Sequence, residues 1–174
     1  VYPAANILWN MARCYEEMNN YEKALRAYRI YTGMDLPDKS KKEGRRRIGL
    51  VKQKWASALE AKAEDARAKG DFRKAVFLYK HVYSVINDPI DLWKMARLHY
   101  KIGELDIALA LLDRFLGLKI GRDEVAAAKQ EMAGIKLKLQ EQRLEQAKKE
   151  AAAGHFAGAM DVLKSGYGLR NDPV

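Results

Sequence analysis

The sequence predicts an all-α fold in which helices pair and the pairs stack into a solenoid. Two observations lead to this prediction: the chain repeats itself at a fixed offset, and its apolar residues follow helical spacing. The composition agrees, because 48% of the 174 residues are hydrophobic, 32% are charged and only four are proline. This balance is typical of a folded helical chain and argues against intrinsic disorder.

The repeat is the strongest signal in the chain. A shift of 84 residues aligns the sequence with itself without a gap. Residues 8–13 (LWNMAR) then lie over residues 92–97 (LWKMAR), and residues 87–89 (NDP) lie over residues 171–173 (NDP). Chance rarely produces one offset that holds across a whole chain, so we interpret the sequence as a double repeat.

Four turn-like sites, two in each 84-residue unit, mark smaller units within the repeat. They read Asn19-Asn20-Tyr21, Gly70-Asp71-Phe72, Gly103-Glu104-Leu105 and Gly154-His155-Phe156. An alanine follows each of them at the same distance, at Ala24, Ala75, Ala108 and Ala159. Asn and Gly tolerate the left-handed conformation that ends a helix, and a small alanine lets two helices approach closely. Each site is therefore predicted to join two packed helices.

The spacing of the turns alternates between short and long, which predicts two kinds of helix pair. We expect short pairs at about 4–18 with 21–33 and at about 89–102 with 105–118. Long first helices are expected at about 39–69 and 122–153, with partners at 72–86 and 156–167. Glycine weakens helices, so a local break near Gly44, Gly49 or Gly134 is a further expectation. The whole is expected to be a single domain over 1–174, with units at about 5–38, 39–88, 89–121 and 122–172.

The first unit resembles the tetratricopeptide repeat. The positions that match are Leu8, Met11, Ala12, Tyr15, Asn19, Tyr21, Ala24 and Tyr28. The second and third units match similarly, whereas the fourth departs from the pattern at Arg143 and Glu150. Residues 11–15 (MARCY) through 36–38 (LPD) also resemble bacterial repeat proteins of the cell envelope. The resemblance implies a right-handed superhelix that binds other proteins and performs no catalysis.

In this family the first helix of each pair lines a concave groove. The resemblance therefore implies a partner-binding face that contains Asn6, Trp9, Arg13, Trp93, Arg97, Tyr100 and Lys101, and it places Glu16 and Glu17 on the same groove face. Trp and Arg are enriched at binding hot spots, and a Trp–Arg pair four residues apart can form a cation–π contact. The alternative is that Trp9 and Trp93 pack against the adjacent repeat and enlarge the core.

A basic run offers a second hypothesis for function. The net charge is +9, and six cations gather at Lys39, Lys41, Lys42, Arg45, Arg46 and Arg47. Such a cluster attracts nucleic acid or anionic lipid, although a solvated helix face is the commoner explanation. No aromatic residue is interleaved with it as a base-stacking platform requires. Self-assembly through the open ends of a solenoid is a third alternative.

The sequence gives little support to catalysis. His81, His99 and His155 belong to different repeat positions, so no shared metal site is expected, and no cofactor or small-molecule substrate is implied. We expect His99 in the core and His155 at an exposed turn. Cys14 lies between core positions and is expected to be a buried small hydrophobe.

The sequence restricts the cellular location of the chain only broadly. No apolar run approaches the length that spans a membrane, and residue 1 is not Met. We expect a soluble chain from the bacterial periplasm, cell envelope or cytoplasm. The motif at residues 171–173 suggests that further repeats follow.

Overall fold

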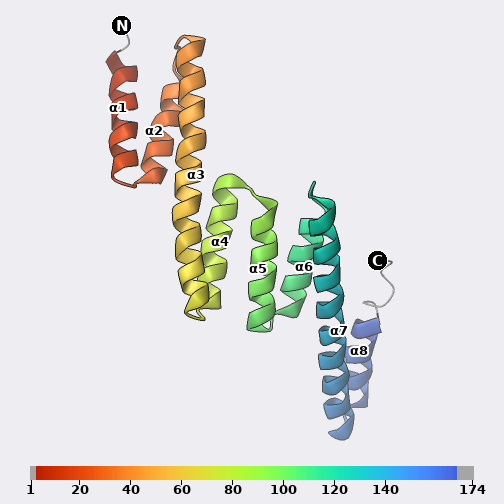
Figure 1. Cartoon of the computed structure of the whole chain (residues 1–174). Coiled ribbons are helices and arrows are strands. Elements are labelled where there is room, and N and C mark those ends of the chain that lie inside the picture. The colour runs from red at the N-terminus through yellow and green to blue at the C-terminus, as the bar shows by residue number, and fades with distance from the viewer. Residues whose placement is uncertain (1–2, 168–174) are drawn as a thin grey trace. The chain divides into compact units, whose positions relative to one another are not determined.

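The computed structural model describes residues 3–167, and in that range the chain forms eight α-helices and no strand (Figure 1). Unit 1 contains α1 (Pro3–Glu17), α2 (Tyr21–Gly33), α3 (Asp38–Ala68) and α4 (Phe72–Ile86). Unit 2 contains α5 (Pro89–Ile102), α6 (Leu105–Leu116), α7 (Arg122–Ala152) and α8 (Phe156–Tyr167). The predicted all-α fold, with its alternation of short and long helix pairs, is confirmed.

The repeat offset is present in the helices themselves. α3 and α7 each contain 31 residues, and both begin and end at positions that are equivalent under the 84-residue shift. The expected break near the helical glycines is wrong, because α3 and α7 run without interruption. Packing along both long helices outweighs the weak helix propensity of glycine.

The turns within the pairs share one backbone geometry. One or two residues after the first helix, the chain adopts a left-handed conformation at Asn19, Gly70, Gly103 and Gly154. In unit 1 the next helix then begins with a side-chain cap: Asn20 and Asp71 accept hydrogen bonds from the backbone three residues ahead. These polar turns end one helix and start the next, as the sequence predicted.

The chain divides into two compact units between Asn87 and Asp88. Within unit 1 each helix packs against the next one along the chain, so α1 contacts α2, α2 contacts α3 and α3 contacts α4. Unit 2 follows the same order from α5 to α8. Each long helix therefore contacts a neighbour on both sides, and it is the central element of its unit.

Small residues lie where the helices approach most closely. The four alanines that follow the turns, Ala24, Ala75, Ala108 and Ala159, are all buried. In unit 1 larger side chains surround this contact, and the core contains Tyr28 and Val51 with Trp9 and Trp55 packed against it. The close approach predicted from the alanine pattern is confirmed.

Gly44 marks the closest approach of α3 to α2. A methyl group at this position would collide with Cγ2 of Thr32 and lie 3.1 Å from the ring of Tyr31. Thr32 has little freedom to move, because it is branched at Cβ and its hydroxyl donates a 3.0 Å hydrogen bond to the Arg29 carbonyl. A methyl group added in the same way at Gly49, about one and a half turns further along α3, would have no neighbouring atom within 4 Å.

These two glycines give a matched test of the α2–α3 packing. We expect Gly44→Ala to lower the free energy of unfolding by about 1–3 kcal/mol, because the added methyl overpacks the contact. Gly49→Ala is expected to raise it by about 0.5–1 kcal/mol through helix propensity alone. Urea unfolding of both variants checks the pair. Equal stabilisation by both substitutions would contradict the close approach.

Candidate functional site

The predicted groove face of unit 1 lies on α1. Asn6 and Arg13 are exposed there, whereas Trp9 is half-buried. The Trp9 ring meets Tyr28 edge-on at 5.3 Å between centroids and lies 5.1 Å from Tyr31. Trp9 therefore joins α1 to α2 through an aromatic cluster and keeps only part of its surface for a partner.

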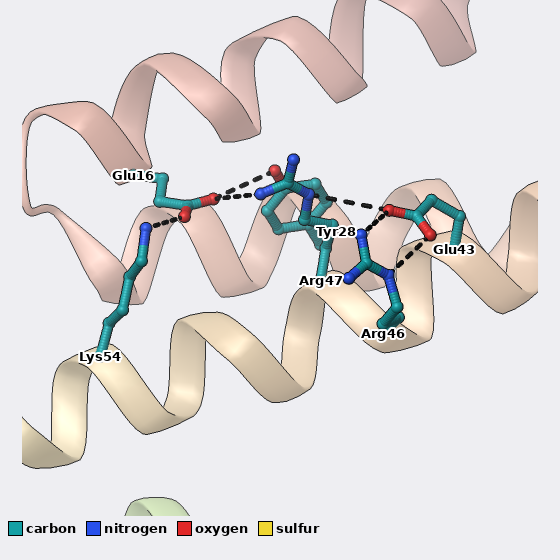
Figure 2. Close-up of polar contacts among 6 residues, drawn as sticks. All are labelled: Glu16, Tyr28, Glu43, Arg46, Arg47 and Lys54. Atoms are coloured by element: carbon teal, nitrogen blue, oxygen red, sulfur yellow. Dashed lines mark hydrogen bonds and ion pairs between the residues drawn. The ribbon is translucent and has the colours of Figure 1, made fainter.

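The same face of unit 1 is closed by a buried carboxylate. Glu16 is only 6% exposed, and Figure 2 shows it between Lys54 and Arg47 of α3 and Tyr28 of α2. Lys54 Nζ lies 2.5 Å from one carboxylate oxygen, and Arg47 lies 4.0 Å from the other. The Tyr28 hydroxyl donates to Glu16 at 3.4 Å. Glu16 therefore connects three helices and is not available to a ligand.

The equivalent face of unit 2 has a different polar centre. Trp93 is 8% exposed and packs against Phe115 of α6 at 5.3 Å. Its indole nitrogen donates a 2.7 Å hydrogen bond to Glu131 of α7, and Arg97 pairs with the same carboxylate. The Arg97 guanidinium also lies 4.4 Å from the centroid of the Trp93 ring, which confirms the predicted cation–π contact.

Glu131 is ionised by its surroundings. Burial alone would raise its pKa, but hydrogen bonds from Arg97 and Trp93, together with the charge of Arg97, lower the pKa below 4.5. The same pairing raises the pKa of Arg97. Glu131 thus presents a negative charge at neutral pH and accepts hydrogen bonds.

A pocket of about 390 Å³ opens beside this cluster in unit 2. α5 contributes Arg97, Tyr100 and Lys101, α6 contributes Leu112, and α7 contributes Glu131, Gly134 and Ile135. Lys138 Nζ lies 4.6 Å from the centroid of the Tyr100 ring, so a second lysine stands close to the pocket. Apolar walls with a few convergent polar groups are typical of a ligand pocket.

Three of the predicted groove residues therefore meet at one pocket, while the others have different surroundings. Arg97, Tyr100 and Lys101 line the pocket, and Trp93 supports it from the core. Sequence reasoning missed Glu131 and Gly134. The repeat offset could have indicated both, because each position changes its residue type between the two copies: Glu131 is equivalent to Arg47, and Gly134 is equivalent to Leu50.

The basic run lies on the first half of α3. Lys39, Lys42, Arg45 and Arg46 are exposed there, whereas Lys41 and Arg47 are partly buried. Acidic residues of the chain contact two of these six cations. Arg46 forms two hydrogen bonds with Glu43 at 2.8 and 2.7 Å, and Arg47 lies close to both Glu43 and Glu16 (Figure 2). Part of the run is therefore neutralised within the protein.

The remaining candidate chemical groups are scattered. His99 is partly buried and its Nδ1 lies 2.6 Å from Glu104, and His155 is exposed as predicted. The expected burial of Cys14 is wrong: the residue is exposed, because the face of α1 on which it lies is not covered.

Among residues 3–167 no cluster of His, Cys, Asp and Glu is suited to hold a metal ion. None of the helices described combines the length and the apolar character that crossing a membrane requires.

The repeated pairs of antiparallel helices, joined by short polar turns, define a helical-repeat protein. Residues 8–40 match the family model of the tetratricopeptide repeat. This match identifies a tetratricopeptide repeat in α1, α2 and the start of α3. The family is generally a protein–protein interaction module and is typically non-catalytic. No curated protein sequence matches the chain closely enough to count as a relative.

The buried carboxylate of unit 1 can be tested by truncation. We expect Glu16→Ala to lower the free energy of unfolding by about 1–3 kcal/mol, because it removes the acceptor shared by α2 and α3. Glu17→Ala, on the exposed neighbour, is expected to change it by less than about 0.5 kcal/mol. Urea unfolding followed by circular dichroism measures both. An equal effect of the two substitutions would mean that Glu16 does not connect the helices.

The ionised Glu131 predicts a dependence on pH. Because its pKa is lower in the folded chain than in the unfolded chain, its contribution to stability is present above pH 4.5 and is lost as the pH falls through the lowered folded value. The change is small, since about a third of the side chain is exposed. Native protein is expected to lose more stability than Glu131→Gln between about pH 6 and pH 3. Glu145→Gln on the exposed face of α7 is the control and should behave like the native chain.

Proposed function

We propose that the chain is a non-catalytic scaffold that binds a segment of another protein on unit 2. The observation that supports this most directly is the pocket between α5, α6 and α7. It combines the apolar side chains of Leu112 and Ile135 with the ring of Tyr100 and the exposed cation Lys101. Burial of apolar groups next to a few charged partners is the usual chemistry of peptide recognition.

The contrast with unit 1 supports placing the main contact on unit 2. In unit 1 the buried Glu16 fills the equivalent face and pairs with Lys54. In unit 2 the equivalent residues are Tyr100 and Lys138, which are in contact beside an open pocket. We include the exposed Asn6 and Arg13, with the half-buried Trp9, as a second and shallower contact surface on unit 1.

The basic run supports a weaker alternative. Lys39, Lys42 and Arg45 are exposed on α3 and give an anionic surface, whether nucleic acid or lipid, three cations to contact. Arg46 and Arg47 lie against Glu43, and this reduces the positive field of the run. We therefore place partner-protein binding first.

Affinity capture from the source cell tests the proposal. The double variant Tyr100→Ala/Lys101→Glu is expected to lose the partner that native protein retains, because truncating a buried aromatic anchor commonly costs about 2 kcal/mol or more. The variant Lys39→Glu/Lys42→Glu on α3 is the matched control and is expected to keep the partner. Circular dichroism of both variants should equal that of the native chain.

The two hypotheses differ in their response to salt and to these variants. Binding in the pocket should change little between low and moderate salt, whereas binding to phosphates should fall steeply. Capture that survives the Tyr100 and Lys101 substitutions but is lost in the α3 variant and at moderate salt would overturn the proposal in favour of an anionic partner.

A further inference from the structure

Two replacements between equivalent positions of the repeat lie at the pocket of unit 2. The helices α3 and α7 have identical lengths and equivalent ends, so residues 84 apart can be compared as equivalent positions of the repeat. Tyr28 of unit 1 corresponds to Leu112 of unit 2, and Leu50 corresponds to Gly134. Both replacements put a smaller side chain in unit 2, and both of the smaller residues line the pocket.

Unit 1 has a tyrosine at the position equivalent to Leu112. Tyr28 is completely buried, and its ring packs edge-on against Trp9. Its hydroxyl donates a hydrogen bond to the carboxylate of Glu16. A phenol therefore occupies the position, with its ring in an aromatic cluster and its hydroxyl donating to a carboxyl group.

Unit 2 offers similar chemical groups at the lining of its pocket. The buried side chains of Leu112 and Ile135 lie at its apolar base, and Tyr100 gives an aromatic wall. A carboxylate is again present, because Glu131 lines the pocket. It accepts hydrogen bonds from Arg97 and Trp93, and a carboxylate has room for a further donor.

The charges around the pocket indicate what should flank the aromatic residue. Lys101 lines the pocket and is exposed, and Lys138 stands beside Tyr100. The Glu131 charge is balanced by Arg97, so the two lysines leave the entrance positive. A segment with acidic residues next to its aromatic residue complements this distribution.

We infer that the unit 2 pocket binds one tyrosine side chain of an acidic partner segment. The phenol hydroxyl donates to Glu131, and the flanking carboxylates pair with Lys101 and Lys138. The inference rests on the proposed function, since it specifies the partner of the same surface. A tyrosine is favoured over phenylalanine because only tyrosine supplies the donor.

The experiment is a titration of the ¹⁵N-labelled chain with three tripeptide amides, each flanked by glutamates and differing in a central Tyr, Phe or Leu. The reporters are the indole N–H of Trp93 and the Nε–H of Arg97, because both donate to Glu131. We expect the tyrosine peptide to shift both signals in a saturable way. The phenylalanine peptide should bind roughly tenfold more weakly, and the leucine peptide more weakly still.

Filling the pocket provides the matched control. Gly134→Leu places in unit 2 the residue that unit 1 has at the equivalent position, and nothing lies within 4 Å of the new Cβ. Gly49→Leu makes the same change on exposed α3, again with nothing within 4 Å. Both variants should fold with native circular dichroism. Tyrosine-peptide binding is expected to be lost in Gly134→Leu and kept in Gly49→Leu, with a partial loss in Gly134→Ala.

Two outcomes would overturn the inference. The leucine peptide could bind as tightly as the tyrosine peptide, or binding could survive in Gly134→Leu; either result would exclude a tyrosine-specific pocket. If no peptide binds while partner capture still depends on Tyr100 and Lys101, the tyrosine preference is wrong and the proposed function stands. If capture is also independent of these residues, both proposals fail together.

Discussion

The close approach of neighbouring helices at buried small residues is the constraint on which the rest of the structure depends. Alanine follows each turn, and Gly44 brings α3 against Thr32 and Tyr31 of α2. Because these positions have little or no side chain, the larger residues beside them must fill the space between the helices. The aromatic cluster of Trp9, Tyr28 and Tyr31 is the result in unit 1.

The two units have the same order of helices but different polar clusters. In unit 1 the acid lies on α1, where Glu16 meets Lys54 and Arg47 of α3. In unit 2 the acid lies on α7, where Glu131 meets Arg97 and Trp93 of α5. Both arrangements link the first and third helices of a unit through a carboxylate. The first arrangement buries its carboxylate, whereas the second has a pocket beside it, so unit 2 contains the candidate binding site.

Side-chain surroundings followed less directly from the pattern than helix positions did. The cation–π pair of Trp93 and Arg97 was predictable, because it needs only residues four apart on one helix. The roles of Glu16 and Glu131 were not, since each depends on partners more than 30 residues away on another helix. Cys14 was misplaced for a related reason: periodicity gives the apolar face of a helix but does not say whether a neighbour covers it.

The sequence by itself determined the all-α class, the offset of the repeat, the turns and the approximate ends of the helices. These features depend on residues close together in the chain, and the left-handed turns and the helical spacing of apolar residues act locally. The tertiary structure decided which carboxylate is buried and where a pocket remains. A pocket is space that no side chain fills, and in unit 2 residues of α5, α6 and α7 line that space. Only the packing of α6 and α7 with α5 brings the residues that line the pocket together.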